Sequence, residues 1–323
     1  MTKRLLRAGA VLLVSAAVFA AAKPGSPPKS TPPAKSEPEP AASPRTPQKL
    51  AEGAWAMMTK GGANAGWFTF GDSVIAVDAG RSADDANAIL AAIAETAGKR
   101  PVSYLILTND FGPHAGGAEV FARRGATVVC HENFVGVVQA LVARSAKPEK
   151  PGSKAAGATA AVFGIGSRLV LASPTRHVIV RHLGPADSAG DLAVLLAEDK
   201  VLFSGDLVES YLLPPLFSKD IDLQGWQSAL TLLSNLNAKV VVPGYGPIGP
   251  PAAIAATREY LARALAAAET ILRDQTPDGF VATRIEEADL KIEGLPDELK
   301  KAHEANVKAL VARLKSKSTA PKS

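Results

Sequence analysis

The fold of this chain is decided by a stretch that leads from an apolar run into a pair of glycines: Leu107-Thr108-Asn109-Asp110-Phe111-Gly112-Pro113-His114-Ala115-Gly116-Gly117. The apolar run at 102–108 predicts a buried strand. The residues at 115–124 predict a short helix that the glycine pair opens. A strand followed closely by a helix is typical of an α/β domain.

The alternation of strands and helices continues on both sides of this stretch. On the N-terminal side we expect strands at 66–71 and 73–78, joined by a Gly-Asp turn, and a helix at 83–98 with Ser82 as its N-cap. On the C-terminal side the expected elements are a strand at 126–130, a second set of strands at 162–163, 168–171, 177–183, 192–197 and 201–204, a helix at 223–236, a strand at 239–242, and helices at 252–274 and 297–314.

The N-terminal residues differ from the rest in composition. Lys3, Arg4 and Arg7 precede a short apolar run that ends in small residues, which is typical of a cleaved secretory signal peptide at residues 1–22. An uncleaved anchor is the alternative, but the run is short for a membrane span. We therefore expect an exported protein, periplasmic or extracellular, with no stable membrane span after cleavage.

Three further boundaries follow from composition. Residues 23–49 are rich in Pro, Ser and Lys, which predicts a disordered linker. The folded domain is expected at 50–316, followed by a disordered tail at 317–323. The one cysteine, Cys130, cannot form an internal disulfide and is expected to pack in the core.

The charge distribution argues against a nucleic-acid partner. The formal net charge is +5, but the excess of Lys and Arg lies within residues 1–49, where Glu37 and Glu39 are the only acidic residues. The folded part is close to neutral and offers no basic surface for a polynucleotide. A small molecule or a protein remains as the expected partner.

Several segments resemble the metallo-β-lactamase superfamily, and they occur in the family's order. They are Val77-Asp78-Ala79-Gly80, the stretch at 107–117, Gly184-Pro185-Ala186 through Gly190-Asp191-Leu192, Val201-Leu202-Phe203-Ser204-Gly205-Asp206, and Val242-Pro243-Gly244-Tyr245-Gly246. The resemblance implies an α/β fold, a four-layer αββα sandwich, to which this chain adds C-terminal helices.

The same resemblance implies a metal site from which most ligands have been lost. The family's loop reads Thr-His-x-His-x-Asp-His-x-Gly-Gly, and its His and Asp side chains hold one or two zinc ions that activate water. In this loop Asn109, Phe111 and Pro113 replace ligands, and only His114 matches. Further along, Asp187 and Tyr245 stand at His positions, whereas Asp206 matches the bridging Asp. The chain is thus a divergent member with a degraded metal-binding motif.

The remaining polar residues admit more than one interpretation. His114, Asp187 and Asp206 are the candidate ligands for one divalent metal such as Zn, Mn or Mg, although we expect no cofactor. We favour a hydrogen-bonded pair of His114 and Asp206 over a remnant metal site. Tyr245 is either a proton-donating or ligand-binding hydroxyl, or a filler of the lost imidazole's volume.

Other side chains near the predicted site receive more modest roles. Asp78 is expected to support the ligand loop from the end of its strand. We expect Phe111 to fill a cavity rather than to stack on a substrate. Asp110 and Asp191 are carboxylates near the cleft that either act there or cap turns.

The histidines outside the motif are expected to have structural roles. We expect His131 to order a loop and His303, on a charged helix, to be solvated. His177 and His182 lie five positions apart on one strand, so they face opposite sides of the sheet.

These observations lead to hypotheses of different classes, and they leave open whether the chain is an enzyme. The first is a non-catalytic pseudo-hydrolase that binds a ligand or partner. The alternative is a hydrolase with a rebuilt one-metal or metal-free site, for which His114, Asp206 and Tyr245 are the candidate catalytic residues, acting on an ester, thioester or lactam. A third is an interaction surface on the C-terminal helices.

Overall fold

The computed structural model describes residues 46–143, 161–210, 213–216, 218, 220–287, 292 and 295–319; for residues 317–319 only the backbone is described. The predicted signal peptide, and the predicted linker as far as residue 45, lie outside the described residues. No helix in the described part of the chain is long and apolar enough to cross a membrane.

The chain forms twelve strands among its described residues. They are β1 (Gln48–Ala51), β2 (Ala54–Met58), β3 (Asn64–Phe70), β4 (Ser73–Val77), β5 (Val102–Ile106), β6 (Thr127–His131), β7 (Val162–Ile165), β8 (Arg168–Ala172), β9 (His177–His182), β10 (Leu192–Leu196), β11 (Val201–Glu209) and β12 (Val240–Tyr245).

The helices alternate with these strands and then continue alone at the C-terminal end. They are α1 (Ala83–Ala97), α2 (Gly112–Ala115), α3 (Ala118–Arg123), α4 (Val135–Ala143), α5 (Leu223–Ser234), α6 (Ala252–Arg273), α7 (Val281–Ile285) and α8 (Asp297–Thr319), with short 3₁₀ turns at Glu132–Phe134 and Asp278–Phe280.

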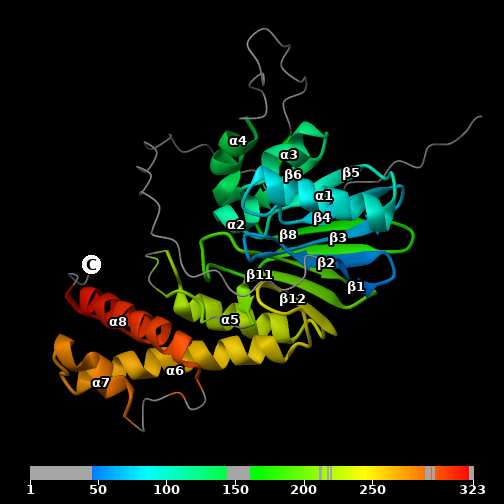
Figure 1. The fold of residues 1–323 in the computed structure, drawn as a ribbon. Helices are drawn as coiled ribbons and strands as arrows, with labels where there is room; N and C mark the ends of the chain where they lie inside the picture. The colour runs from blue at the N-terminus through cyan, green and yellow to red at the C-terminus, as the bar shows by residue number, and fades with distance from the viewer. Residues whose placement is uncertain are drawn as a thin grey trace, which may run out of the picture.

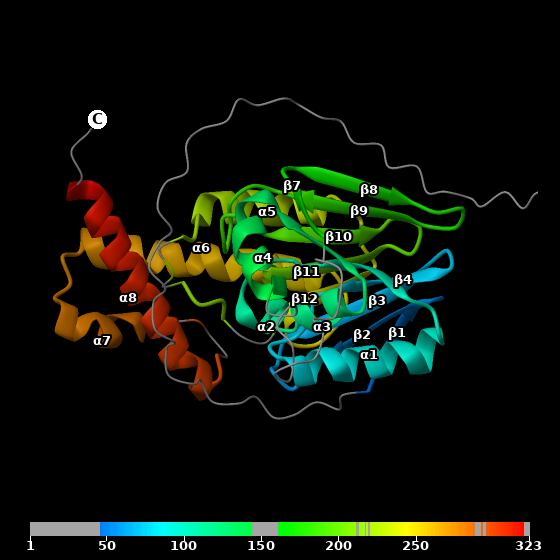
Figure 2. The same ribbon diagram turned by 90° about the horizontal axis from the view of Figure 1, so that it is seen from above.

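The strands form two sheets that pack face to face (Figures 1 and 2). The first sheet has seven strands in the order β1-β2-β3-β4-β5-β6-β7, and the second has five in the order β12-β11-β10-β9-β8. The prediction that residues 162–163 belong to the second set of strands is wrong, because β7 pairs in parallel with β6 and completes the first sheet. The sheet to which β7 belongs depends on its pairing with another strand, and the local residue pattern does not predict that pairing.

Helices cover both outer faces and give the predicted αββα sandwich. Helices α1, α3 and α4 bury Ile89, Phe121 and Val138 against the first sheet. Helices α5 and α6 bury residues such as Trp226 and Leu261 against the second. A third apolar layer fills the space between the sheets. Strands β10 and β11 are buried along their whole length because protein covers both of their faces.

Local sequence sets several of these element ends. The hydroxyl of Ser82 caps α1 by accepting a hydrogen bond from the backbone N–H of Asp85, as predicted. The predicted helix at 115–124 is divided, since α2 ends at Ala115 and α3 begins at Ala118. The glycine pair between them permits close backbone packing, because a Cβ at Gly117 would overlap the carbonyl oxygen of Ala79.

The structure also moves two predicted boundaries and adds elements. Gln48 and Lys49, assigned to the linker, pair with Ala56 and Trp55 in the first sheet. Helix α8 continues to Thr319, beyond the predicted start of the tail. Strands β1 and β2 and helices α4 and α7 were not predicted. Each is short, so its sequence pattern extends over few residues.

The C-terminal helices α6, α7 and α8 extend past the sandwich (Figure 1). The expectation that His303 on α8 is solvated is wrong, because its side chain faces α6 and is 3% exposed. Its Nδ1 lies 3.4 Å from the hydroxyl of Tyr260, and burial lowers the pKa of the ring. Charged residues on the outer side of α8 concealed this buried polar position.

The contact between the two sheets predicts a large effect of one added methyl group. A Cβ at Gly66 on β3 would overlap the buried ring of Phe203 on β11. We expect Gly66→Ala to lower the free energy of unfolding by about 1–3 kcal/mol, measured by urea denaturation.

The control is Gly136→Ala on α4, where an added Cβ meets no atom within 4 Å. Here the better helix propensity of alanine should leave stability unchanged or raise it by up to about 1 kcal/mol. Equal effects of the two substitutions would contradict the proposed sheet contact.

Candidate functional site

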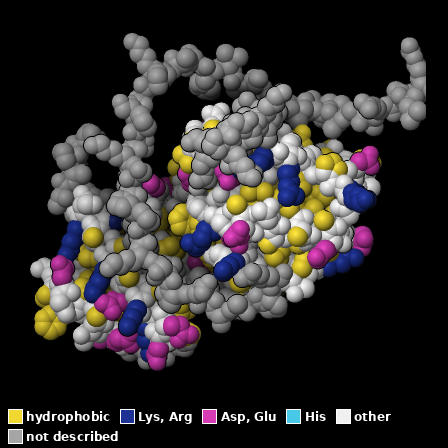
Figure 3. Space-filling model, turned by 45° about the horizontal axis from the view of Figure 1, so that its top comes forward, with side chains coloured by type: hydrophobic (Ala, Val, Ile, Leu, Met, Phe, Trp, Pro, Cys, Tyr) yellow, Lys and Arg dark blue, Asp and Glu magenta, His cyan; other side chains and the backbone are white. Residues whose placement is uncertain are grey.

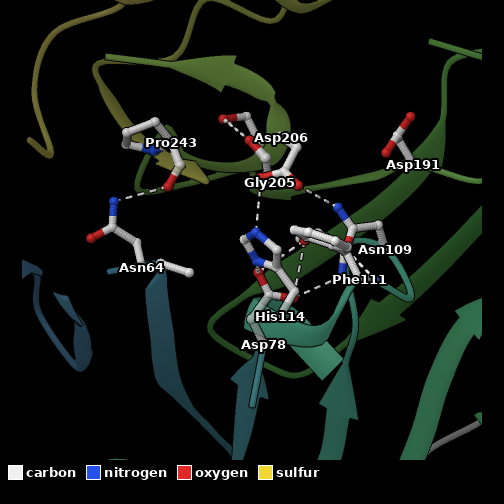
Figure 4. A network of polar contacts seen from close by, with 12 residues as sticks. Asn64, Asp78, Asn109, Phe111, His114, Asp191, Gly205, Asp206 and Pro243 are labelled. Carbon is white, nitrogen blue, oxygen red and sulfur yellow. Dashed lines mark hydrogen bonds and ion pairs between the residues drawn. The ribbon is translucent and has the colours of Figure 1, made fainter. Parts of the chain in front are cut away.

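The polar residues of the motif meet at one edge of the sandwich, where segments of both sheets come together (Figure 4). Asp78 follows β4, and the loop from Thr108 to Phe111 follows β5 and leads into α2. Asp206 lies within β11 of the second sheet, and Tyr245 ends β12. The sandwich therefore brings segments from four strands to one edge.

Asp78 anchors the loop that follows β5. Its carboxylate accepts hydrogen bonds from the backbone N–H of Thr108 at 2.8 Å and from the Thr108 hydroxyl at 3.0 and 2.9 Å. Its backbone has a φ of 63°, a left-handed conformation that Asp tolerates better than most residues. The supporting role expected for Asp78 is visible in these contacts.

His114 lies between two carboxylates. Its Nδ1 is 2.8 Å from Oδ2 of Asp78, and its Nε2 is 2.8 Å from Oδ1 of Asp206. The ring is fully buried. The hydrogen-bonded pair of His114 and Asp206 that the sequence analysis favoured is therefore present, and it extends to Asp78.

Asn109 completes a chain of hydrogen bonds across the site. Its Nδ2 donates to the second oxygen of Asp206 at 2.9 Å, and its Oδ1 accepts from the backbone N–H of Phe111 at 2.9 Å. Both oxygens of Asp206 thus accept hydrogen bonds from side chains. Gly244 permits this arrangement, because a Cβ there would overlap the Asp206 carboxylate.

The two carboxylates keep His114 charged. Burial by itself disfavours the charged ring, but the negative charges and hydrogen bonds of Asp206 and Asp78 outweigh it and raise the pKa of His114 well above its ordinary value. In the imidazolium form both ring nitrogens donate, one to each carboxylate. The arrangement is a buried, hydrogen-bonded ion triad.

This donor set does not fit a zinc ion. A histidine binds zinc through a nitrogen lone pair, whereas both nitrogens of His114 bond to carboxylates. Both oxygens of Asp206 are also engaged. Across the described residues, no group of three or more His, Cys, Asp or Glu side chains converges in the manner of a metal site.

Asp187 and Asp191 bring further carboxyl groups into the electrostatic neighbourhood of Asp206. Burial raises the pKa of Asp187 to about 9, with added effects from the charges of Asp206 and Asp191. Burial also raises the pKa of Asp191 to about 7, although hydrogen bonds from the backbone N–H and hydroxyl of Ser188 oppose the shift. Asp191 thus orders a turn, one of the two roles predicted for it.

Asp110 lies at the edge of this acidic group. Burial raises the pKa of its carboxyl group. The charge of Asp110 contributes in turn to the raised pKa of Asp191. The surroundings of these three carboxyl groups therefore favour their protonated forms.

The replaced ligand positions lie in different environments. Phe111 is 59% exposed, so the expectation that it fills a cavity is wrong. Its backbone N–H donates to the side-chain oxygen of Asn109, while its ring is exposed to solvent. Pro113 is buried in the first turn of α2. Tyr245 contacts His114 edge-on, with ring centroids 5.6 Å apart and an angle of 89°.

Asn64 is a site residue that the sequence did not reveal. Its Nδ2 donates to the carbonyl oxygens of Pro243 and Gly246, each at 2.9 Å, and so fixes the loop that carries Tyr245. The partners lie 179 and 182 positions away in the chain. No local pattern around Asn64 signals such a contact.

The other histidines lie outside this network. His131 orders its loop as predicted, since Nδ1 accepts from the backbone N–H of Asn133 and Nε2 lies 3.0 Å from the carbonyl of Gly166. Its ring also packs on His182, with centroids 4.1 Å apart. His177 pairs with Glu198 in an exposed position.

Removal of His114 should be costly because it leaves two buried carboxylates without their cation. We expect His114→Gln to lower the free energy of unfolding by about 3–5 kcal/mol at pH 7 in urea denaturation. The folded-state pKa is raised, so the stabilisation by His114 is complete below about pH 6.5 and is lost as the pH rises through the folded-state pKa.

The difference between wild type and variant should therefore shrink at alkaline pH. His177→Gln is the control, since exposed pairs contribute little, and it should change stability by less than about 0.5 kcal/mol. A small effect of His114→Gln at pH 7 would show that the triad does not stabilise the fold.

Asp187 should make the protein less stable as the pH rises. Its folded-state pKa of about 9 lies above the ordinary value, so its favourable contribution is lost between about pH 4 and pH 9. We expect Asp187→Asn to exceed wild type in stability by more than about 1 kcal/mol at pH 8, with a smaller difference at pH 5.

Thermal and urea denaturation across this pH range measure the effect, with Asp72→Asn in an exposed turn as the control. A difference between Asp187→Asn and wild type that does not change with pH would disprove the raised pKa.

The sequence profile of the metallo-β-lactamase superfamily matches residues 58–245. The fold is similar to that of a metallo-β-lactamase from Pontibacter korlensis, with 24% identity, a TM-score of 0.53, and coverage of 67% of this chain and 98% of that chain. No functionally curated protein sequence matches this chain.

Two further solved structures show the same likeness. The FIM-1 metallo-β-lactamase from Pseudomonas aeruginosa, in a mono-zinc form, has 18% identity and a TM-score of 0.53, with coverage of 70% of this chain and 98% of that chain. The DIM-1 metallo-β-lactamase exposed to ceftazidime has 18% identity and a TM-score of 0.52, covering 68% and 96%. At these identities the likeness concerns the fold, and together with the profile match it shows that the chain belongs to the metallo-β-lactamase superfamily.

Proposed function

We propose that this chain is an exported, non-catalytic pseudo-hydrolase that uses the cleft of a former metal site to bind a small molecule or a protein partner. The observation that carries the proposal is the bond between His114 Nε2 and Asp206 Oδ1 at 2.8 Å. In the family resemblance, these are the two positions that keep the ligand residue, and here they bind each other.

Zinc binding at these residues would require several changes at once. His114 must lose a proton that two carboxylates stabilise, and Asp206 must give up hydrogen bonds from His114 and Asn109. Asn109, Phe111 and Pro113 offer no strong zinc ligand in compensation. The donor set therefore favours a metal-free state.

Two side chains of the predicted site support binding. The ring of Phe111 is exposed and apolar, and the buried carboxyl group of Asp187 is polar. On the face shown in Figure 3, basic and acidic side chains are interspersed, which is in keeping with a partner other than nucleic acid. Export rests on the composition of residues 1–22.

One observation favours a second candidate, a metal-free hydrolase acting on an ester, thioester or lactam. With a pKa of about 9, Asp187 holds a proton at neutral pH, as a general acid requires. Tyr245 lies beside His114 and offers a hydroxyl. His114 does not suit the role of base that the sequence hypothesis gave it, because both of its nitrogens are engaged.

Elemental analysis of the chelator-free protein, before and after equilibration with Zn²⁺ or Mn²⁺, tests the main proposal. We expect less than stoichiometric metal in wild type and no further loss in Asp206→Ala. Stoichiometric metal that disappears in Asp206→Ala would overturn the metal-free assignment.

A panel of ester, thioester and lactam substrates separates the two candidates. The pseudo-hydrolase shows no turnover above the Asp206→Ala background. Turnover that persists with chelator and is lost in Asp187→Asn, while Asp72→Asn retains it, would instead support the metal-free hydrolase.

A further inference from the structure

The outer face of the second sheet carries two arginines in direct apposition, away from the His114 site. Arg168 on β8 is the register partner of Arg181 on β9, so both side chains lie on the same face of adjacent strands. Neither has an ion-pair or hydrogen-bond partner among the described residues. Like charges directly opposite each other destabilise a sheet unless an anion lies between them.

An apolar pocket adjoins this pair. A cavity of about 270 Å³ is lined by Arg168 and Arg181 together with Ile179, Ala193, Leu195, Leu202 and Leu236. Strand β8 is the edge strand of the second sheet, and the pocket lies on the face that α5 and α6 cover, since Ala193, Leu195 and Leu202 belong to the same core cluster as the buried residues of these helices. Two cations at the border of an apolar cavity define an amphiphilic site.

Strand register orders the polar and apolar parts of the pocket. Ala193 is the partner of Arg181, and its small side chain leaves space beside the guanidinium groups. Two residues further along each strand, Ile179 pairs with Leu195, and Leu195 pairs with Leu202. The apolar row therefore begins next to the arginines and runs away from β8 across neighbouring strands.

Apolar side chains on this face of the sheet extend beyond the residues that line the pocket. Val170, the register partner of Ile179, is 40% exposed. Exposed aliphatic side chains around an apolar pocket are typical of a binding surface.

We propose that this pocket binds a soluble single-chain aliphatic carboxylate, with the carboxylate between Arg168 and Arg181 and the chain on Leu195, Leu202 and Leu236. Arginine binds carboxylates through paired, charge-assisted hydrogen bonds. A cavity of about 270 Å³ has room for a short aliphatic chain, for which octanoate is a suitable probe. The site shares no residue with the His114 network, so it does not depend on the proposed function.

Calorimetric titration of the full chain tests both parts of the ligand. Octanoate should bind, while octanol, which lacks the charge, and acetate, which lacks the chain, should each bind at least about tenfold more weakly. Equal binding of octanol and octanoate, or no binding of octanoate, would overturn the proposal.

Variants assign the binding to this pocket. Arg168→Gln/Arg181→Gln should weaken octanoate binding by about tenfold or more, whereas Arg263→Gln, at an exposed arginine on α6, should not change it. Arg181→Glu should weaken octanoate binding and strengthen that of octylamine, since the charge at the head-group position is changed.

The arginines are on the surface, so these variants should fold, and the melting temperature of the ligand-free double variant should not fall below that of wild type. Octanoate binding that is unchanged in the folded double variant would place the ligand elsewhere and refute the assignment.

Discussion

The ring of His114 lies between the carboxylates of Asp78 and Asp206, and each ring nitrogen is 2.8 Å from one of them. Asp78 follows a strand of the first sheet, whereas Asp206 belongs to the second. The imidazolium is therefore an electrostatic link between the two halves of the sandwich at the edge where the family places its metal. Removing one member of such a buried group leaves an uncompensated charge, so the three residues depend on one another.

The rest of the site is arranged around this link. The hydroxyl of Thr108 donates a hydrogen bond to Asp78, and the side-chain amide of Asn109 donates to the second carboxylate oxygen of Asp206. The ring of Tyr245 packs edge-on against the His114 ring. A cation held by protein atoms thus occupies the role that a metal ion would have in neutralising the carboxylates. The farther carboxyl group of Asp187 has no such partner, and burial together with neighbouring charge favours its protonated form. In the proposed metal-free state, the positive charge of the His114 imidazolium thus takes the place of the positive charge of a metal ion.

Apolar packing stabilises the scaffold in addition to the His114 triad. Three separate apolar layers hold the helices and sheets together, and the site lies at one edge of the sandwich. The same separation leaves the outer face of β8 and β9 free to carry a pocket that shares no residue with the His114 site. The architecture of a fold therefore does not by itself decide where its functional surfaces lie.

The sequence by itself determined the superfamily and the order of most strands and helices, and it identified the segments that resemble the family's motifs. Those features are encoded locally, in the alternation of apolar runs and in short motifs such as the stretch at 107–117. It also favoured a bond between His114 and Asp206. Only the tertiary structure decided that Phe111 is exposed, that His303 is buried, and that Asn64 holds the Tyr245 loop. These outcomes depend on contacts between residues as far as 182 positions apart, and burial and hydrogen bonding at such distances are set by packing rather than by neighbouring residues.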